Sequence, residues 1–120
     1  MDNKILICDT NRDLVQVLKT ILYELTPAHV LSEATIKDVY QRILLDRPDV
    51  LIVDLGMPNR NADKLMQDIR HEAGKIELHI ISLSATAEGM RLALAAGVDV
   101  SLAKPLDLEE LLGEVNLALQ

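Results

Sequence analysis

The sequence has few cysteines, few aromatic residues and no long apolar stretch, and its basic residues are outnumbered by acidic ones. The lone Cys8 excludes an internal disulfide. No apolar stretch approaches the roughly 20 residues that cross a bilayer, and the chain does not open on a secretion signal. The 12 basic and 19 acidic residues give a net charge of -7, which repels nucleic-acid phosphates and anionic lipid surfaces. We therefore predict a cytoplasmic protein that binds neither nucleic acid nor membranes directly.

The chain has 120 residues, which is enough for one buried core and too few for a second domain. Its hydrophobic fraction of 49% is typical of a globular protein, because disordered chains are poorer in Leu, Ile and Val. We predict a single domain over residues 1–120, which is either a stand-alone module or a domain trimmed at its boundary.

Short apolar runs predict the strands of a parallel sheet. The clearest runs are rich in Ile and Val and are apolar on both faces, which is typical of central strands covered by helices on both sides. They span residues 4–8, 49–53 and 78–83, and two weaker candidates span residues 29–33 and 99–103.

Segments with helical spacing of apolar residues separate these strands. The first covers residues 14–25, with one apolar face, and the second covers residues 39–44 and must end before Pro48. The third, around residues 65–69, has Asn61 as its expected N-cap, and the fourth, residues 87–96, ends at Gly97. The last runs from residue 108 to the end of the chain. Five alternations of strand and helix predict an α/β fold, a doubly wound five-stranded parallel sheet with right-handed crossovers.

Four polar residues stand where the predicted strands end, and the fold would bring them together at the carboxyl edge of the sheet. The carboxylates of Asp9 and Asp54 can hold Mg²⁺. The hydroxyl of Ser84 can donate to an oxyanion, and the ammonium of Lys104 can offset added negative charge. Phosphoryl transfer needs mainly alignment and charge neutralisation from a protein. Asp54 is the predicted nucleophile and would form an acyl phosphate.

Three short motifs resemble, in their order and their spacing along the chain, those of the response-regulator receiver domains of two-component signalling. The resemblance covers essentially the whole chain. The motifs are Asp54 four residues before Pro58, Ser84 followed by Ala85, and Lys104 followed by Pro105 with Ala96-Gly97 upstream.

The resemblance implies a flavodoxin-like strand order 2-1-3-4-5. It also implies that Asp54 accepts a phosphoryl group from a histidine kinase or a phosphotransfer protein, while Ser84 and Lys104 contact the phosphoryl oxygens. The backbone carbonyl of Gly56 would join Asp9 and Asp54 in binding Mg²⁺. Signalling would pass through protein contacts, to an output domain or a homodimer through the fourth helix, fifth strand and fifth helix. The chain would not be an enzyme acting on an external substrate.

The chain departs from the family pattern at three positions. Thr10 stands in the slot of a second acid, so we expect weaker Mg²⁺ binding. Ser101 stands where the family has a Tyr or Phe that acts as a switch, and the chain has no Phe or Trp to replace it, while Tyr23 and Tyr40 lie on predicted helices. Ala62 replaces a glycine, which we expect to restrict the loop after Pro58.

Two other functions compete with phosphoryl acceptance for a chain of this fold class. A receiver retained for protein contacts, signalling without phosphate, remains the alternative that these departures leave open. A flavin or nucleotide binder is disfavoured, because residues 9–13 have no glycine to let backbone amides surround a phosphate and carry acids instead.

Overall fold

The structure, a computed structural model, describes residues 2–56, 60–71 and 77–120. Its five parallel strands form one sheet in the order β2-β1-β3-β4-β5. The strands are β1 (Lys4–Cys8), β2 (His29–Glu33), β3 (Val50–Val53), β4 (His79–Ser84) and β5 (Val100–Ala103). The helices are α1 (Arg12–Leu25), α2 (Ile36–Asp46), α3 (Arg60–His71), α4 (Ala87–Ala96) and α5 (Leu108–Ala118). The predicted fold class and strand order are confirmed.

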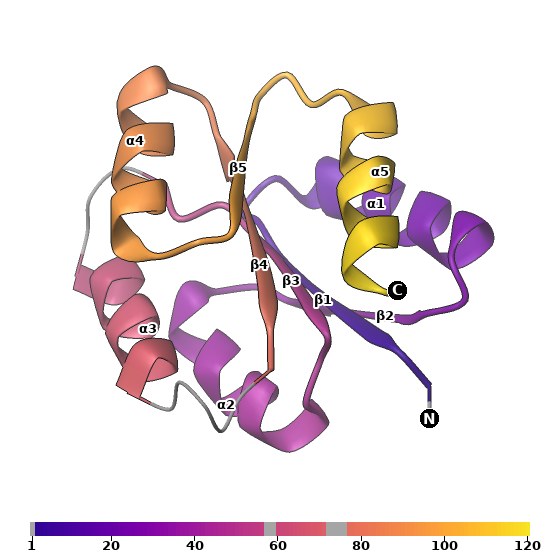
Figure 1. Ribbon diagram of the computed structural model, residues 1–120, viewed down its shortest axis with the longest axis horizontal. Helices are drawn as coiled ribbons and strands as arrows, with labels where there is room; N and C mark the ends of the chain where they lie inside the picture. Colours follow the sequence, from indigo (N-terminus) through magenta and orange to yellow (C-terminus); the bar gives the residue numbers. More distant parts are fainter. Residues whose placement is uncertain (1, 57–59, 72–76) are drawn as a thin grey trace.

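The helices cover both faces of the sheet, with α1 and α5 on one side and α2, α3 and α4 on the other (Figure 1). Successive side chains of a strand point to opposite faces of the sheet, so β1 contributes residues to the apolar core on each face. Ile5 and Ile7 pack with Leu18 of α1, whereas Leu6 packs with Ile43 of α2. This double burial explains why the central strands are apolar on both faces. In the described part of the chain, no helix is long and apolar enough to cross a membrane.

Two helix ends that the sequence predicts are confirmed. α2 stops at Asp46, and Arg47 takes up a left-handed conformation (φ 51°) just before Pro48. α4 ends at Gly97, whose φ of 108° lies in the region that favours glycine.

Three predictions about helices are wrong in detail. α3 already begins at Arg60, so Asn61 lies inside the helix and is not its N-cap. Ala62 also lies within α3, where it is buried, so it contributes to packing and does not restrict a loop. On α1 the buried residues are Leu18 and Leu22, while Val17 and Leu25 of the expected apolar face are exposed. Pro58, at the end of the first motif, lies outside the described residues.

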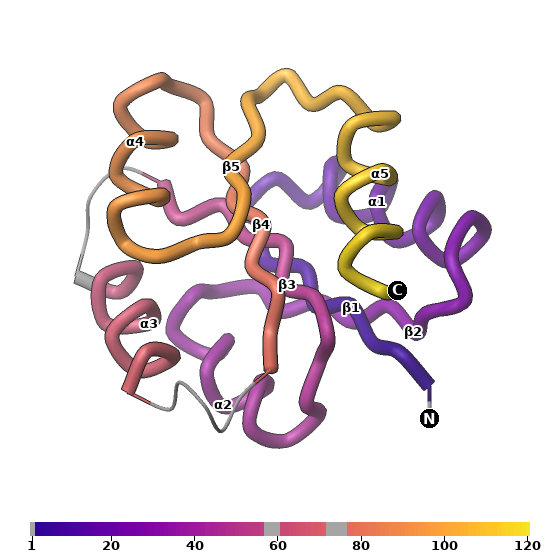
Figure 2. The backbone as a smooth tube through the Cα atoms, in the orientation of Figure 1, coloured from indigo at the N-terminus to yellow at the C-terminus, as the bar shows by residue number. Residues whose placement is uncertain are grey.

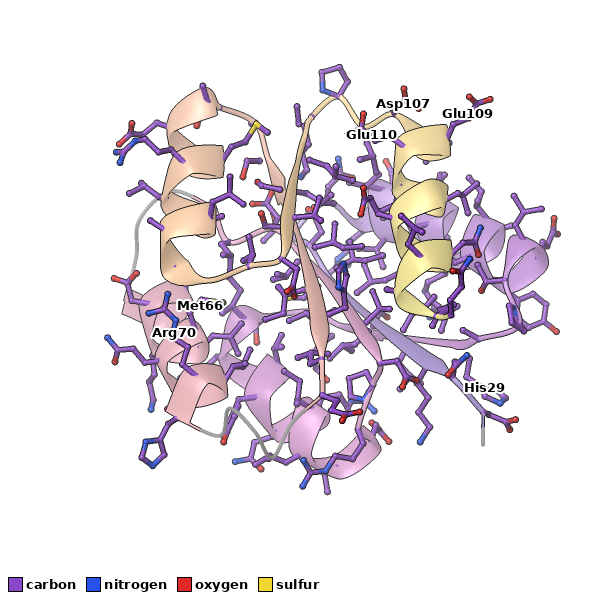
Figure 3. The ribbon with its side chains drawn as sticks, in the orientation of Figure 1. His29, Met66, Arg70, Asp107, Glu109 and Glu110 are labelled. Carbon is purple, nitrogen blue, oxygen red and sulfur yellow. The ribbon has the colours of Figure 1, made fainter. Side chains whose placement is uncertain are left out.

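Gly97 is favoured by its backbone conformation, and the end of the Arg70 side chain lies against it. The guanidinium of Arg70, on the side of α3 next to α4 (Figure 3), donates to the Ala95 carbonyl at 3.0 Å. A Cβ at Gly97 would lie 2.9 Å from Nε and Nη2 of Arg70. We expect Gly97→Ala to lower the free energy of unfolding by about 2 kcal/mol, because the left-handed backbone is strained for alanine and Arg70 must move.

Urea denaturation checks this prediction, and Gly113→Ala in α5 is the matched control. A Cβ at Gly113 meets no atom within 4 Å, so this substitution should stabilise the helix by about 0.5–1 kcal/mol. Equal effects of the two substitutions would contradict the role assigned to Gly97.

Candidate functional site

The loops after β1, β3, β4 and β5 lie at one edge of the sheet, away from the N-terminus (Figure 2). Asp9 follows β1, Asp54 follows β3, Ser84 ends β4 and Lys104 follows β5. Backbone hydrogen bonds continue the sheet into these positions, from the Asp54 amide to the Cys8 carbonyl (3.0 Å) and from the Lys104 amide to the Ser84 carbonyl (2.8 Å). The sheet therefore places the four predicted site residues at its carboxyl edge.

Lys104 joins the two carboxylates of the site. Its Nζ donates to Asp9 Oδ2 and to Asp54 Oδ2, at 2.7 Å each. The second oxygen of each carboxylate accepts from a backbone amide, Asp9 Oδ1 from Asn11 (2.8 Å) and Asp54 Oδ1 from Gly56 (2.7 Å). The Asp9 side chain is 1% exposed and that of Asp54 22% exposed. Asp9 is thus a buried anchor, while Asp54 is open to molecules from outside.

The protonation of Lys104 is favoured by this arrangement. Burial lowers the pKa of the Lys104 ammonium, but its hydrogen bonds to Asp54 and Asp9 outweigh this effect and raise the pKa above the ordinary value of 10.5. Lys104 is therefore a cation at neutral pH and offsets one of the two carboxylate charges.

We expect Lys104→Met to lower the free energy of unfolding by about 2 kcal/mol at pH 7, because it leaves the buried Asp9 carboxylate without a cation. The raised pKa sets the pH dependence of this loss. The contribution of Lys104 is present below pH 10.5 and disappears as the pH rises through the higher value of the folded state.

Denaturation of wild type and variant at several pH values measures the effect. Lys64→Met is the control, because Lys64 makes a solvent-exposed pair with Asp68 at 3.3 Å, and such a pair contributes at most about 0.5 kcal/mol. A loss as small as that of the control would show that the Lys104 bridge contributes little to stability.

Ser84 and Gly56 line a pocket next to Asp54, with a volume of about 210 Å³. Thr86 also lines this pocket and is the N-cap of α4, because its side chain accepts from the Gly89 amide at 2.9 Å. Ser84 therefore does not cap α4. Gly56 has a φ of 70°, which favours glycine and which the sequence alone did not reveal.

The site offers hard oxygen ligands of the kind that Mg²⁺ prefers. The carboxylates of Asp9 and Asp54 and the Gly56 carbonyl could hold such an ion, which usually keeps several waters and needs only one or two carboxylates from the protein. Thr10 is exposed, and no three His, Cys, Asp or Glu side chains gather into a metal cluster within the described ranges. An ion at this position would share the carboxylates with the ammonium of Lys104.

Ser101 has a hydrogen-bond partner that the sequence did not predict. Ser82 of β4 donates to the Ser101 hydroxyl of β5 at 2.7 Å, and the two residues are direct neighbours in the register. Their strand neighbours Leu83 and Leu102 pack on the α1 and α5 side, so the two serines face the side of α4. Ser101 is thus held by a polar partner on the neighbouring strand, and Ser82, a polar residue within the apolar run of β4, was the available signal.

Cys8 adds no chemistry to the site. It is 2% exposed, and burial, with a smaller contribution from the Asp9 charge, raises the pKa of its thiol to about 12. A thiol that remains protonated at neutral pH is a poor nucleophile, so Cys8 acts as a small apolar residue of the core.

The sequence matches the response regulator receiver domain family over residues 5–116. The chain belongs to this family of receiver domains. Solved structures agree, among them a putative response regulator from Chloroflexus aurantiacus (25% identity, 99% of this chain and 98% of that one, TM-score 0.85). Another is the N-terminal domain of the nisin resistance regulator NsrR (27% identity, 100% of both chains, TM-score 0.81).

Curated relatives of the receiver domain include the transcriptional regulatory protein KdpE of Staphylococcus aureus, which is 29% identical over 98% of this chain and 50% of its own length. The response regulator MprA of Mycobacterium ulcerans is 28% identical over 100% of this chain and 51% of its own. The chain therefore spans about half the length of the curated relatives it matches.

Proposed function

We propose that residues 1–120 form one receiver domain that accepts a phosphoryl group on Asp54 from a histidine kinase or a phosphotransfer protein. The observation that carries this proposal is the bridge of Lys104 between the buried Asp9 and the accessible Asp54, beside a pocket that Ser84 lines. Such a site holds a nucleophilic carboxylate and a hydroxyl at a pocket that a phosphoryl group can enter, and a fixed cation is bonded to that carboxylate.

The proposed transfer uses the four residues at the carboxyl edge of the sheet. A carboxylate oxygen of Asp54 attacks phosphorus, and the departing group leaves with the electron pair of the broken bond. Lys104 then pairs with the new phosphoryl oxygens, to which the Ser84 hydroxyl donates. Asp9, Asp54 and the Gly56 carbonyl would hold Mg²⁺, which would supply positive charge at the phosphoryl oxygens. The domain would catalyse at most its own phosphorylation and dephosphorylation.

The response would pass to a partner through α4, β5 and α5, either to an output domain or to a second copy of the domain. Leu94 of α4 and Leu117 of α5 are exposed apolar residues on these helices, and Glu109 and Glu110 lie near Asp107 at the start of α5 (Figure 3). These features support a protein contact of mixed apolar and charged character at this face.

Incubation with acetyl phosphate and Mg²⁺ tests the proposed function. We expect the intact mass to rise by one phosphoryl group, and beryllofluoride to shift the amide resonances around Asp54, Ser84 and Lys104. Neither change would occur in a receiver that signals through protein contacts without phosphate, so their joint absence would overturn the proposal in favour of that alternative.

A further inference from the structure

A second cavity, of about 90 Å³, adjoins the pocket beside Asp54 and lies between α3 and α4. Its walls are mostly apolar. They include Leu55, Ala62 and Met66 on one side and Leu92, Ala93 and Ala96 of α4 on the other. Figure 3 shows Met66 on the side of α3 next to α4.

The two cavities share two lining residues, and both are glycines. Gly56 and Gly89 line the pocket at Asp54 as well as the apolar cavity. Gly56 is held at a φ of 70°, and a Cβ on Gly89 would lie 3.1 Å from Thr86 Oγ1 and 3.4 Å from Ser84 Cβ. The backbone of Gly56 favours glycine, and a side chain at Gly89 would crowd Thr86 and Ser84, so neither residue places a side chain between the two cavities.

We propose that the joined cavities make this receiver domain prefer, among small phosphodonors, acyl phosphates with a short, uncharged alkyl chain. The proposal rests on phosphoryl acceptance by Asp54. The phosphate of the donor lies against Ser84 and Lys104, and its acyl chain passes between Gly56 and Gly89 into the apolar cavity.

The transfer of the phosphoryl group from the acyl phosphate to Asp54 needs no further reactant. An Asp54 oxygen forms the new bond to phosphorus, and the bond from phosphorus to the acyl oxygen breaks. The electron pair leaves with that oxygen, so the products are aspartyl phosphate and the carboxylate of the acyl group. The apolar cavity acts only by binding the chain of the donor.

The size and charge of the cavity set the class of donor. An engineered apolar cavity of about 150 Å³ holds benzene, so the volume of about 90 Å³ here suits a chain of a few carbons. The exposed Asp63 stands at its wall and disfavours chains that end in a carboxylate. Each buried methylene contributes about a fourfold gain in binding. We therefore expect butyryl phosphate to react with a kcat/KM about tenfold above that of acetyl phosphate, mainly through a lower KM.

The rates are followed by phosphate-affinity gel electrophoresis or intact mass, since the chain has no tryptophan to report on the reaction. The donors are butyryl phosphate, acetyl phosphate and phosphoramidate, which carries no acyl group. Equal kcat/KM for butyryl and acetyl phosphate would overturn the inference and leave the proposed function intact. Transfer from none of the three donors would instead overturn the proposed function.

Two leucine substitutions on α4 separate cavity binding from a general effect of donor hydrophobicity. Ala96→Leu places a larger side chain in the cavity wall and should bring the ratio of butyryl to acetyl kcat/KM close to one. Ala95→Leu adds the same side chain at an exposed position of the same helix and should keep the ratio. If Ala96→Leu does not fold by circular dichroism, Ala96→Val takes its place. A ratio that survives the filling of the cavity would overturn the inference.

Discussion

Asp54→Asn is expected to abolish phosphoryl uptake from acetyl phosphate and from a kinase. The amide has no nucleophilic oxygen anion, so the acyl phosphate cannot form. The substitution changes the surroundings little, because the amide oxygen can still accept from the Gly56 amide and Lys104 keeps its bond to Asp9. Intact mass after incubation with the donor measures the loss, and circular dichroism checks that the variant is folded.

Asp13→Asn provides the control for Asp54→Asn. Asp13 is an exposed carboxylate in the first turn of α1, and its removal lowers the net negative charge by the same amount. This variant should take up phosphate at the rate of the wild type. Uptake that persists in Asp54→Asn would point to another carboxylate as the acceptor, with Asp9 the first to examine.

The sequence was sufficient to predict the fold because the strands are local and strongly apolar. β1 and β3 are buried on both faces, which gave runs of Ile, Leu and Val whose length and β-branched residues favour a strand over a helix. Helix ends were predictable where backbone chemistry fixes them, as at Pro48 and Gly97. Val17 and Leu25 fit the helical spacing equally well and are nevertheless exposed, because spacing does not tell how wide a face the neighbouring helices cover.

The sequence predicts which residues form the candidate site, but it does not predict how their side chains contact one another. Topology alone brings Asp9, Asp54 and Lys104 to one edge, but the length of the lysine side chain decides that its ammonium reaches both carboxylates. The bond between Ser82 and Ser101 depends on a cross-strand register that a single sequence does not specify. The need for glycine at Gly56 depends on a backbone angle that likewise appears only in the folded chain.

Thr10→Asp is expected to tighten Mg²⁺ binding by about ten- to a hundredfold. Lys104 already offsets one of the two carboxylate charges of the site, so an incoming cation meets a net charge of only about one. A carboxylate at position 10, directly after the buried Asp9, would add one negative charge and one hard oxygen ligand where Mg²⁺ needs both. Amide shifts during a Mg²⁺ titration give the affinity, and the rise in Tm with Mg²⁺ gives an independent measure through linkage.

Thr20→Asp is the matched control for this prediction. Thr20 lies on the exposed surface of α1, where its hydroxyl donates to the Gln16 carbonyl at 3.1 Å, so the substitution adds the same charge away from the carboxyl edge. It should leave Mg²⁺ affinity close to that of the wild type, because charges separated by more than about 10 Å are largely screened at ordinary ionic strength. The same affinity in both variants would mean that position 10 does not face the ion. In that case the metal site assigned to Asp9, Asp54 and Gly56 would have to be moved, while the acceptor role of Asp54 would remain open to its own test.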